Sequence, residues 1–313
     1  MIEFGIHLGA PSAEPMDDRH AYYRELLSRA EGSFTSAYVS DHLMKDDAPM
    51  LEAWTALAFL AAEFPNFRFG HLVLSQSYRN PALLAKMAAT FQYLSEGRLI
   101  LGIGAGWQAD EYAAYGYPYP SAGTRVEQLG EAIDVLRAMW TKSPAHYEGV
   151  HYQVRGAYCE PRPATPIPIL VGGHRPKLMR VVAEKADIWQ WDGPIDQYRL
   201  PYDLLVAACA DVGRDLASVR LSAAGEAYFP VDPATFPAPA PVPISAAQDP
   251  SGSFVDEVDW VMGPTPADAI AQLRPLIDLG VTHVTVYFHD RRSVDIFARE
   301  VIPAFTARRA GGA

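Results

Sequence analysis

Short apolar runs alternate with longer segments of helical periodicity along almost the whole chain. The runs are rich in β-branched and aromatic residues, and several are apolar at nearly every position, as a strand buried on both faces requires. On this basis we predict eight strands, at Ile2–Leu8, Ser36–Ser40, Phe67–Leu74, Leu99–Ile103, Ile167–Val171, Ala186–Gln190, Val219–Glu226 and His283–Tyr287.

Most of the predicted strands are followed directly by a segment in which apolar residues recur at helical spacing. Asn80 followed by Pro81 is typical of a helix start, and Gly280 at the end of an apolar segment is typical of a helix end. The predicted helices are Asp17–Ala30, Leu51–Glu63, Asn80–Leu94, Val126–Trp140, Arg175–Glu184, Tyr198–Val212, Pro266–Leu279 and Ser293–Arg308.

Eight strands alternating with eight helices predict an α/β fold, the (β/α)8 or TIM barrel. A doubly wound open sheet uses the same alternation and is the alternative. The count of eight favours the barrel. The length of 313 residues fits one domain over residues 1–313, since a barrel of this kind takes about 250 residues and the rest forms insertion loops.

Two segments interrupt the regular alternation. Ala145–Val154 alternates in polarity around Gly149, which predicts a small β-hairpin. A proline-rich insertion is expected at residues 230–262, because its first part, Pro230–Pro250, holds seven prolines in 21 residues. A long loop of this kind inside a compact domain is usually a lid, a binding loop or a disordered segment.

The composition excludes several classes of protein. Hydrophobic residues make up 49% of the chain, enough for a large core, and the net charge of −11 argues against nucleic-acid binding. The N-terminus has no basic region before an apolar run, and no stretch of about 18 apolar residues occurs, so we expect a cytoplasmic protein without a membrane span. Cys159 and Cys209 lie too far apart in sequence for a metal-ligand pair.

The site of a barrel lies at the carboxyl ends of its strands, which selects a small set of residues. Asp41 and His42 follow the second strand, and one of the two side chains should face the cavity, because adjacent residues of an extended chain point to opposite sides. Histidine is the natural group for proton transfer near neutral pH. A hydrogen-bonded structural pair is the alternative interpretation.

Two glycine-rich turns also lie at predicted strand ends. Gly172 and Gly173 precede a helix, so their amides and the helix N-terminus would suit a phosphate, with Lys177 and Arg180 adding charge. A plain glycine turn is the alternative. The run from Gly102 to Trp107 does not match the dinucleotide-binding fingerprint, and we interpret its glycines as admitting a flat ligand.

Hydrolase chemistry finds little support in the sequence. The first strand ends in His7-Leu8-Gly9, which lacks the second histidine of a zinc-binding pair. No Gly-x-Ser-x-Gly motif is present, which disfavours a serine hydrolase.

Taken in order, the motifs of the chain resemble the bacterial luciferase-like family of flavin- and deazaflavin-dependent oxidoreductases, the luciferase-like monooxygenase family. The resemblance runs through nearly the whole chain. The segments that carry it are Tyr38–His42, Phe69–Leu74, Tyr78–Lys86, Leu94–Leu99, Leu101–Trp107 with Glu111-Tyr112, Pro168–Gly173 and Ala186–Trp189.

The resemblance implies a flavin-type ring in the mouth of the barrel, its phosphate near Gly172 and Gly173, and a cis peptide bond between Leu72 and Val73 that presses on the ring. An Asp-His pair after the second strand is similar to members that use the deazaflavin coenzyme F420, so we expect an F420-dependent oxidoreductase acting on a small organic substrate. The implied cofactor-binding residues are Asp41, His42, Leu72, Val73, Gly104, Gly106, Trp107, Gly172, Gly173 and His174.

His42 is the candidate catalytic residue, for proton handling or for stabilising charge on the reduced ring. The expected substrate pocket consists of His7, Trp189, Trp191 and His289, although the two tryptophans are equally consistent with core packing. A flavoprotein with FMN, acting as a monooxygenase, is the alternative, and a non-catalytic ligand-binding barrel is a second one. A homodimer is consistent with the resemblance.

The sequence departs from the family pattern at two kinds of position. Gln92 and His71 replace an aspartate and a threonine that are common in the family. Trp107 stands in the neighbourhood where deazaflavin-dependent sugar-phosphate dehydrogenases have a glutamate, while Glu111 resembles the more general family glutamate. This departure argues against the sugar-phosphate reaction.

Overall fold

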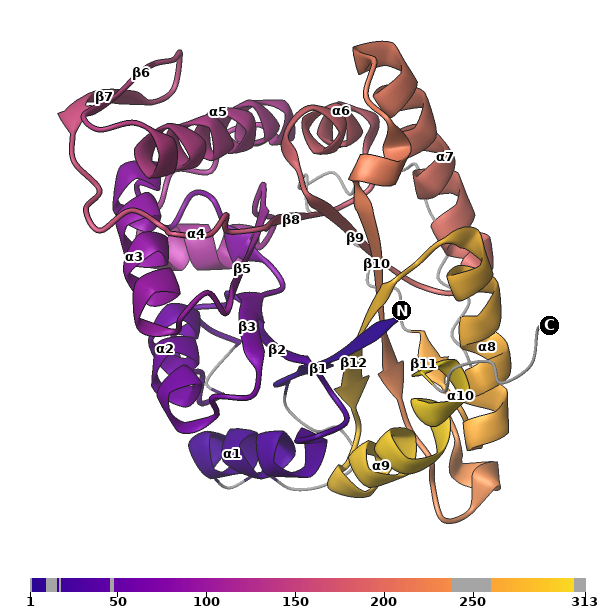
Figure 1. The fold of residues 1–313 in the computed structure, drawn as a ribbon. Coiled ribbons are helices and arrows are strands. Elements are labelled where there is room, and N and C mark those ends of the chain that lie inside the picture. The colour runs from indigo at the N-terminus through magenta and orange to yellow at the C-terminus, as the bar shows by residue number, and fades with distance from the viewer. Residues whose placement is uncertain (1, 10–15, 17, 46–47, 238–259, 307–313) are drawn as a thin grey trace.

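The structure is a computed structural model that describes residues 2–9, 16, 18–45, 48–237 and 260–306. Eight parallel strands close into a barrel, and helices surround it as a ring (Figure 1). Around the barrel the strands follow the order β1 (Glu3–His7), β2 (Ser36–Val39), β3 (Arg68–His71), β5 (Leu99–Gly104), β8 (Ile169–Gly172), β9 (Ile188–Asp192), β10 (Arg220–Ala227) and β12 (His283–Phe288).

Pairing between β9 and β10, and between β12 and β1, closes the circle. This closure excludes the doubly wound open sheet and confirms the predicted TIM barrel. Two short strands extend the sheet, with β4 (Leu74–Ser75) pairing with β5 and β11 (Val261–Met262) pairing with β10.

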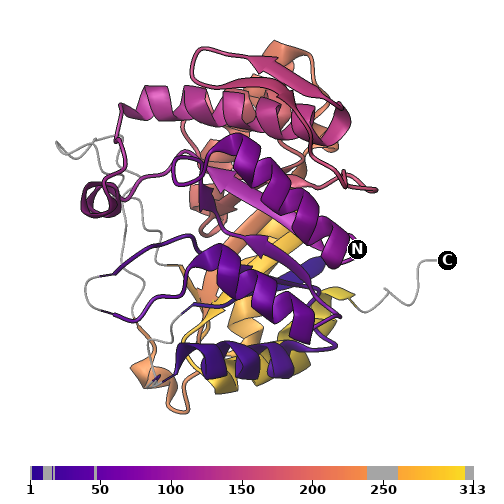
Figure 2. The same ribbon diagram turned by 90° about the vertical axis from the view of Figure 1, so that its left-hand side faces the viewer.

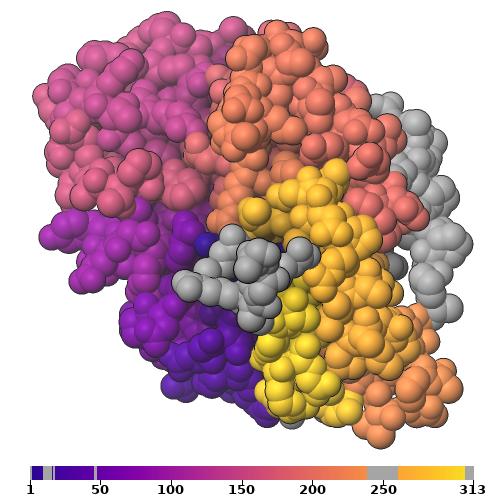
Figure 3. Space-filling view, turned by 45° about the vertical axis from the view of Figure 1, so that its right-hand side comes forward, coloured from indigo at the N-terminus to yellow at the C-terminus, as the bar shows by residue number. Residues whose placement is uncertain are grey.

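The helices lie where the apolar periodicity predicts them, with ends that differ by a few residues. They are α1 (Arg19–Ala30), α2 (Ala53–Glu63), α3 (Pro81–Leu94), α5 (Ala122–Thr141), α6 (Pro176–Lys185), α7 (Ile195–Val212), α8 (Pro266–Leu279), α9 (Arg291–Ile296) and α10 (Pro303–Thr306). The Asn80 side chain caps α3, and Gly280 ends α8 in the left-handed region at φ 117°, both as predicted. On the face shown in Figure 3, α7 and α8 pack side by side.

The predicted C-terminal helix is not continuous. A π-helical turn, η3 (Phe297–Val301), separates α9 from α10. The amide of Ile302 bonds to the carbonyl of Phe297 five residues earlier, and Pro303, which has no amide hydrogen, starts α10. Residues 307 and 308 of the prediction lie outside the described residues.

The loops contain a few further elements. The predicted hairpin is present as β6 (Ala145–Glu148) and β7 (Gln153–Ala157). A short helix that the sequence analysis missed, α4 (Ala109–Tyr115), follows β5 and lies at one edge of the ring (Figure 2). The remaining elements are two 3₁₀ turns, η1 (Leu216–Ser218) and η2 (Pro233–Thr235). Most of the predicted insertion, residues 238–259, lies outside the described residues.

Alternation of side chains along the strands divides the core in two. On β5, Leu99, Leu101 and Ile103 face the helices and join the large core between strands and helices. Ile100 points inward, where it packs with Tyr38 and Leu170 in the barrel interior. Both faces of the sheet are therefore buried, which is why the strands are apolar at nearly every position.

Candidate active site

A cavity of about 990 Å³ opens at the carboxyl ends of the strands. Residues from the ends of β2, β5, β8, β9, β10 and β12 line it, as expected of a TIM barrel. All ten residues predicted to bind the cofactor are among the lining: Asp41, His42, Leu72, Val73, Gly104, Gly106, Trp107, Gly172, Gly173 and His174.

The third predicted strand is interrupted inside the cavity wall. β3 ends at His71, β4 begins at Leu74, and the peptide bond between Leu72 and Val73 is cis, as the resemblance implied. A Cβ on Gly104 would lie 2.8 Å from Cγ2 of Val73. Glycine at this position therefore makes room for the valine, rather than only for a flat ligand as the sequence analysis expected.

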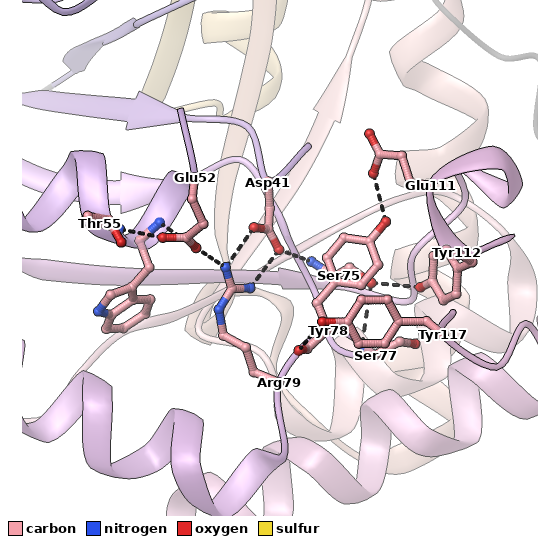
Figure 4. Close-up of polar contacts among 11 residues, drawn as sticks. Asp41, Glu52, Thr55, Ser75, Ser77, Tyr78, Arg79, Glu111, Tyr112 and Tyr117 are labelled. Atoms are coloured by element: carbon pink, nitrogen blue, oxygen red, sulfur yellow. Dashed lines mark hydrogen bonds and ion pairs between the residues drawn. The ribbon is translucent and has the colours of Figure 1, made fainter. Parts of the chain in front are cut away.

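Asp41 is held by two groups beneath the cavity. Its carboxylate accepts two hydrogen bonds from Arg79, at 2.8 and 2.9 Å, and a third at 3.0 Å from the amide of Ser75 (Figure 4). Ser75 belongs to β4, just after the cis bond. Asp41 thus ties the end of β2 to the segment that carries Val73.

Arg79 connects Asp41 to a second carboxylate. Its Nη2 lies 2.5 Å from Oε1 of Glu52, which caps α2 by accepting from the amides of Trp54 and Thr55 (Figure 4). Burial raises the pKa of Glu52, but the bonds from Thr55 and Arg79 outweigh it and set the pKa at about 2. Arg79 and Glu52 together fix the α2 end of the loop that leaves β2.

His42 faces the cavity and is anchored from α4. Its Nδ1 lies 2.9 Å from Oε1 of Glu111, whose other oxygen accepts a hydrogen bond of 2.7 Å from the Tyr78 hydroxyl. The Glu111 side chain is 1% exposed and that of His42 is 30% exposed. Burial raises the pKa of Glu111, but the bonds from His42 and Tyr78 lower it below its ordinary value. The ionised Glu111 therefore accepts a hydrogen bond from Nδ1–H of His42, which leaves Nε2 as the acceptor nitrogen of the neutral ring.

Trp107 stands beside this histidine. Its ring meets the His42 ring edge-on, with centroids 5.7 Å apart, and its carbonyl accepts a hydrogen bond from Tyr119. Gly106, the preceding residue, has φ 79°, and a Cβ there would lie 1.9 Å from the Tyr112 hydroxyl. The turn that presents Trp107 to the cavity therefore requires glycine.

Positive charge gathers at the β5 and β8 side of the cavity. Arg175 and Lys177, around the start of α6, line it, whereas Arg180 does not and instead pairs with Glu184. Arg125 of α5 also lines it, and its Nη2 is buried without a hydrogen-bond partner among the described residues. Arg125 was not among the predicted site residues, because it comes from a helix and not from a strand end.

Three of the four residues expected in the substrate pocket lie outside the lining of this cavity. Trp189 is fully buried, and its indole donates a hydrogen bond of 2.8 Å to the carbonyl of Gly173, so it belongs to the core. His7 is buried behind Tyr287 and bonds to Ser40, and His289 bonds to Glu226 from outside the lining. Of the four, only Trp191 lines the cavity, packed against His174.

The described part of the chain contains neither a candidate metal centre nor a candidate membrane helix. No group of three or more His, Cys, Asp or Glu side chains there is arranged to hold a metal ion. No helix in that part is long and apolar enough to cross a membrane.

Comparison with known proteins shows the family to which this chain belongs. The model of the luciferase-like monooxygenase family matches residues 2–234, about three quarters of the chain. The chain belongs to the luciferase-like monooxygenase family. It is accordingly a luciferase-like oxidoreductase with a small-molecule substrate.

Several known proteins resemble this chain over nine tenths or more of its length. An F420-dependent glucose-6-phosphate dehydrogenase of Intrasporangium calvum is 29% identical, with 90% of this chain and 94% of the relative covered. A solved F420-dependent secondary alcohol dehydrogenase superposes with a TM-score of 0.79 at 19% identity, covering 97% of this chain and 98% of that one. EDTA monooxygenase of Chelativorans sp. BNC1 superposes with a TM-score of 0.77 at 16% identity, covering 97% and 93%. At such identities the two solved structures show the fold alone.

The luciferase-like cavity suits a flavin-type cofactor with an anionic tail. Val73 offers an apolar surface for one face of a ring. Nη2 of Arg125, which has no hydrogen-bond partner in the described part of the chain, lies with Arg175 and Lys177 on one side. An acidic protein that binds an anion needs such a local concentration of positive charge. Lys177 is partly offset by its pair with Glu127 at 2.6 Å.

Proposed function

We propose that this luciferase-like enzyme uses the deazaflavin F420 and moves a hydride between that cofactor and a small organic substrate. The observation that carries the proposal is the anchored pair at the end of β2, where Asp41 is fixed by Arg79 and His42 by Glu111. The full-length relatives named as F420-dependent dehydrogenases support the same cofactor.

In this proposal the residues on the β5 and β8 side hold the cofactor's anionic tail. Arg125, Arg175 and Lys177 would attract the phosphate, and Gly172 and Gly173, which lack side chains, would let it come near the backbone, where the Gly173 amide already donates to the carbonyl of Gln190 at 3.2 Å. Val73 supports one face of the ring, with Gly104 giving it room. When bound, F420 supplies the acceptor or donor of the hydride.

His42 handles the proton that accompanies the hydride. Because Glu111 keeps the proton of the neutral imidazole on Nδ1, Nε2 accepts a proton from a substrate hydroxyl as its carbon loses a hydride and becomes a carbonyl. The carboxylate of Glu111 then stabilises the imidazolium, as the aspartate does in a catalytic triad. In the reverse direction the same Nε2 returns the proton.

Titration of the purified apoprotein with F420 and with FMN tests the cofactor. We expect F420 to bind at least about tenfold more tightly, a difference of about 1.4 kcal/mol. Tighter binding of FMN overturns the assignment and favours the monooxygenase alternative. Binding of neither cofactor favours a barrel without this chemistry.

Two alanine substitutions of histidines test whether His42 handles the proton. His42→Ala should lower turnover by about a hundredfold or more, because general acid–base catalysis contributes on this scale. His146→Ala, on the exposed hairpin, is the matched control and should leave turnover unchanged. Equal turnover of the two variants would remove His42 from the mechanism.

A further inference from the structure

The two sides of the cavity carry opposite charges. Arg125, Arg175 and Lys177 lie on the β5 and β8 side, whereas Asp192 ends β9 and Glu226 lies near the end of β10. We call Asp192 and Glu226 the acidic wall. Because β9 and β10 are neighbours in the barrel, the two carboxylates belong to one part of the cavity.

Asp192 is fixed by a chain of hydrogen bonds through the barrel interior. The Gln190 amide donates to Oδ1 of Asp192 at 2.7 Å, and its Oε1 accepts from the Ser222 hydroxyl at 2.6 Å. The hydroxyl of Ser222 has one hydrogen, which it donates to Gln190. Its oxygen therefore accepts a hydrogen bond from Nδ1 of His283, 2.8 Å away. This order holds Gln190 with its amide toward Oδ1 of Asp192, which is a fixed hydrogen-bond acceptor, while burial raises the pKa of the carboxyl group.

Glu226 is held from the opposite direction. In the pairing of β10 with β12, Glu226 lies opposite Tyr287. It comes two residues after Ala224, which pairs with Asp192 of β9. His289 bonds to its Oε2, and Tyr287 joins it in the cavity lining. The acidic wall thus consists of two positioned acceptors beside a phenol.

Neither β9 nor β10 is followed closely in sequence by a lysine or arginine that could balance the acidic wall. Residues 193–198 after β9 and residues 227–273 after β10 contain neither lysine nor arginine. Of the four lysine and arginine residues that line the cavity, three lie on the β5 and β8 side and the fourth, Lys45, follows β2. The basic group in contact with the acidic wall is His289, which is bonded to Glu226, so a phosphate or carboxylate of a substrate there would meet mainly repulsion.

Building on the proposed function, we propose that the substrate presents hydrogen-bond donors, hydroxyl or ammonium groups, to Asp192 and Glu226, and carries no anionic group on that side. The cofactor side takes the negative charge, and the acidic wall selects a neutral or cationic substrate. This separates the chain from relatives named for glucose 6-phosphate. Asp192 and Glu226 are then determinants of substrate specificity.

Binding of three probes that share a secondary alcohol tests the inference without turnover. They are 1-amino-2-propanol, 1,2-propanediol and lactate, which are cationic, neutral and anionic. In ligand-observed NMR titrations of the full chain, with excess inorganic phosphate to occupy the cations of the β5 and β8 side, we expect the amino alcohol to bind at least about tenfold more tightly than lactate, with the diol between them. In the Asp192→Asn, Glu226→Gln double variant the ratio should fall to about threefold or less.

A control variant and a single substitution distinguish an effect of the acidic wall from a general effect of lost charge or of misfolding. Asp196→Asn, an exposed carboxylate in the first turn of α7, should leave the ratio as in the wild type. If the double variant fails to fold, Glu226→Gln alone provides the comparison, since this side chain is 40% exposed. Tighter binding of lactate or of glucose 6-phosphate overturns the inference, as does an unchanged ratio in the variant or no binding of the amino alcohol at tens of millimolar.

Failure of the proposed function gives a different result. The probe ratio is a property of the acidic wall and is measured without cofactor, whereas the cofactor assignment depends on the F420 and FMN titrations. Weak F420 binding with an intact preference for the amino alcohol would reject the cofactor and keep the acidic wall. The opposite pair of results would keep the cofactor and reject the wall.

Discussion

Nδ1 of His42 and Oε1 of Glu111 lie 2.9 Å apart, although 68 residues separate them between the end of β2 and helix α4. This contact orients the imidazole toward the cavity. It also gives the buried Glu111 carboxylate a partner in an otherwise unfavourable environment.

Replacing Glu111 should affect catalysis through His42. In Glu111→Gln we expect kcat to fall by about tenfold to a hundredfold, because a neutral amide stabilises the imidazolium poorly. KM should change by less than about threefold, since Glu111 touches His42 and not the substrate. Steady-state kinetics measured through the absorbance of F420 give both values. Glu148→Gln, exposed on the hairpin, is the control, and a loss confined to KM would contradict the positioning role.

Replacing Gly104 should disturb the surface that Val73 presents. The new Cβ of Gly104→Ala would meet Cγ2 of Val73 at 2.8 Å, so the valine must shift. We expect a loss of about 1–3 kcal/mol in the free energy of unfolding and weaker F420 binding. Urea unfolding and cofactor titration provide the two measurements.

Gly130→Ala is the matched control for this substitution. Gly130 lies inside helix α5, where an added Cβ would make only ordinary contacts at 3.8 Å. Alanine there should stabilise the protein by about 0.5–1 kcal/mol and leave cofactor binding unchanged. Equal effects of the two substitutions would show that Gly104 has no special relation to Val73.

Replacing Asp41 should destabilise the protein even without a cofactor. The Asp41 side chain is 1% exposed and takes two bonds from Arg79, so Asp41→Asn leaves a largely buried guanidinium with Glu52 as its remaining charged partner. We expect the free energy of unfolding to fall by about 3 kcal/mol. Urea unfolding of the apoprotein measures it, with Asp196→Asn as control. An unaltered stability would mean that Asp41 serves only the cofactor.

Acid should destabilise the protein through its buried histidines. Burial, together with nearby positive charge, lowers the pKa of His7, His71 and His283 to about 3, from an ordinary value of 6.5. Their contribution to stability is therefore complete above pH 6.5. It is lost as the pH falls from there toward 3, because only the unfolded chain takes up the protons. Each histidine adds at most about 1.4 kcal/mol per pH unit to this loss.

A substitution at His71 separates the contribution of one histidine to the loss of stability in acid. Its two ring nitrogens have no hydrogen-bond partner among the described residues, and its ring stacks on Trp54 with centroids 5.0 Å apart. His71→Phe keeps the stacking and removes the proton site, so stability should fall less steeply between pH 6.5 and 5, by up to about 1.4 kcal/mol per pH unit. Urea unfolding across this range measures the slope. His146→Phe should keep the wild-type slope, and an unchanged slope in His71→Phe would contradict the prediction.

The order of the helices and strands could be predicted from the sequence. Strands buried on both faces must be apolar at nearly every position, and helices that cover a barrel must carry one apolar stripe, so both patterns survive in the chain. Caps such as Asn80 and Gly280 are local in origin and were predicted for the same reason. Short or interrupted elements were not, because α4 has only seven residues and the π-helical turn depends on Pro303 and its neighbours.

The candidate site was predictable where position along a strand decides it. Asp41, His42, Gly172 and His174 follow strand ends, and a barrel brings all such ends to one face. Which way a side chain points there depends on its neighbours in space. Trp189 and Trp191 are two residues apart, yet one is buried beneath Gly173 and the other lines the cavity.

The sequence by itself therefore determined the barrel, the luciferase-like motifs and the lack of cations in the segments after β9 and β10, because these follow from residue type and order alone. Only the tertiary structure decided which charges face one another. Arg125 comes from a helix, Glu111 reaches His42 from another, and Gln190 takes its orientation from Ser222 and His283 on neighbouring strands. Such contacts join residues that are distant in sequence, and no local pattern records them.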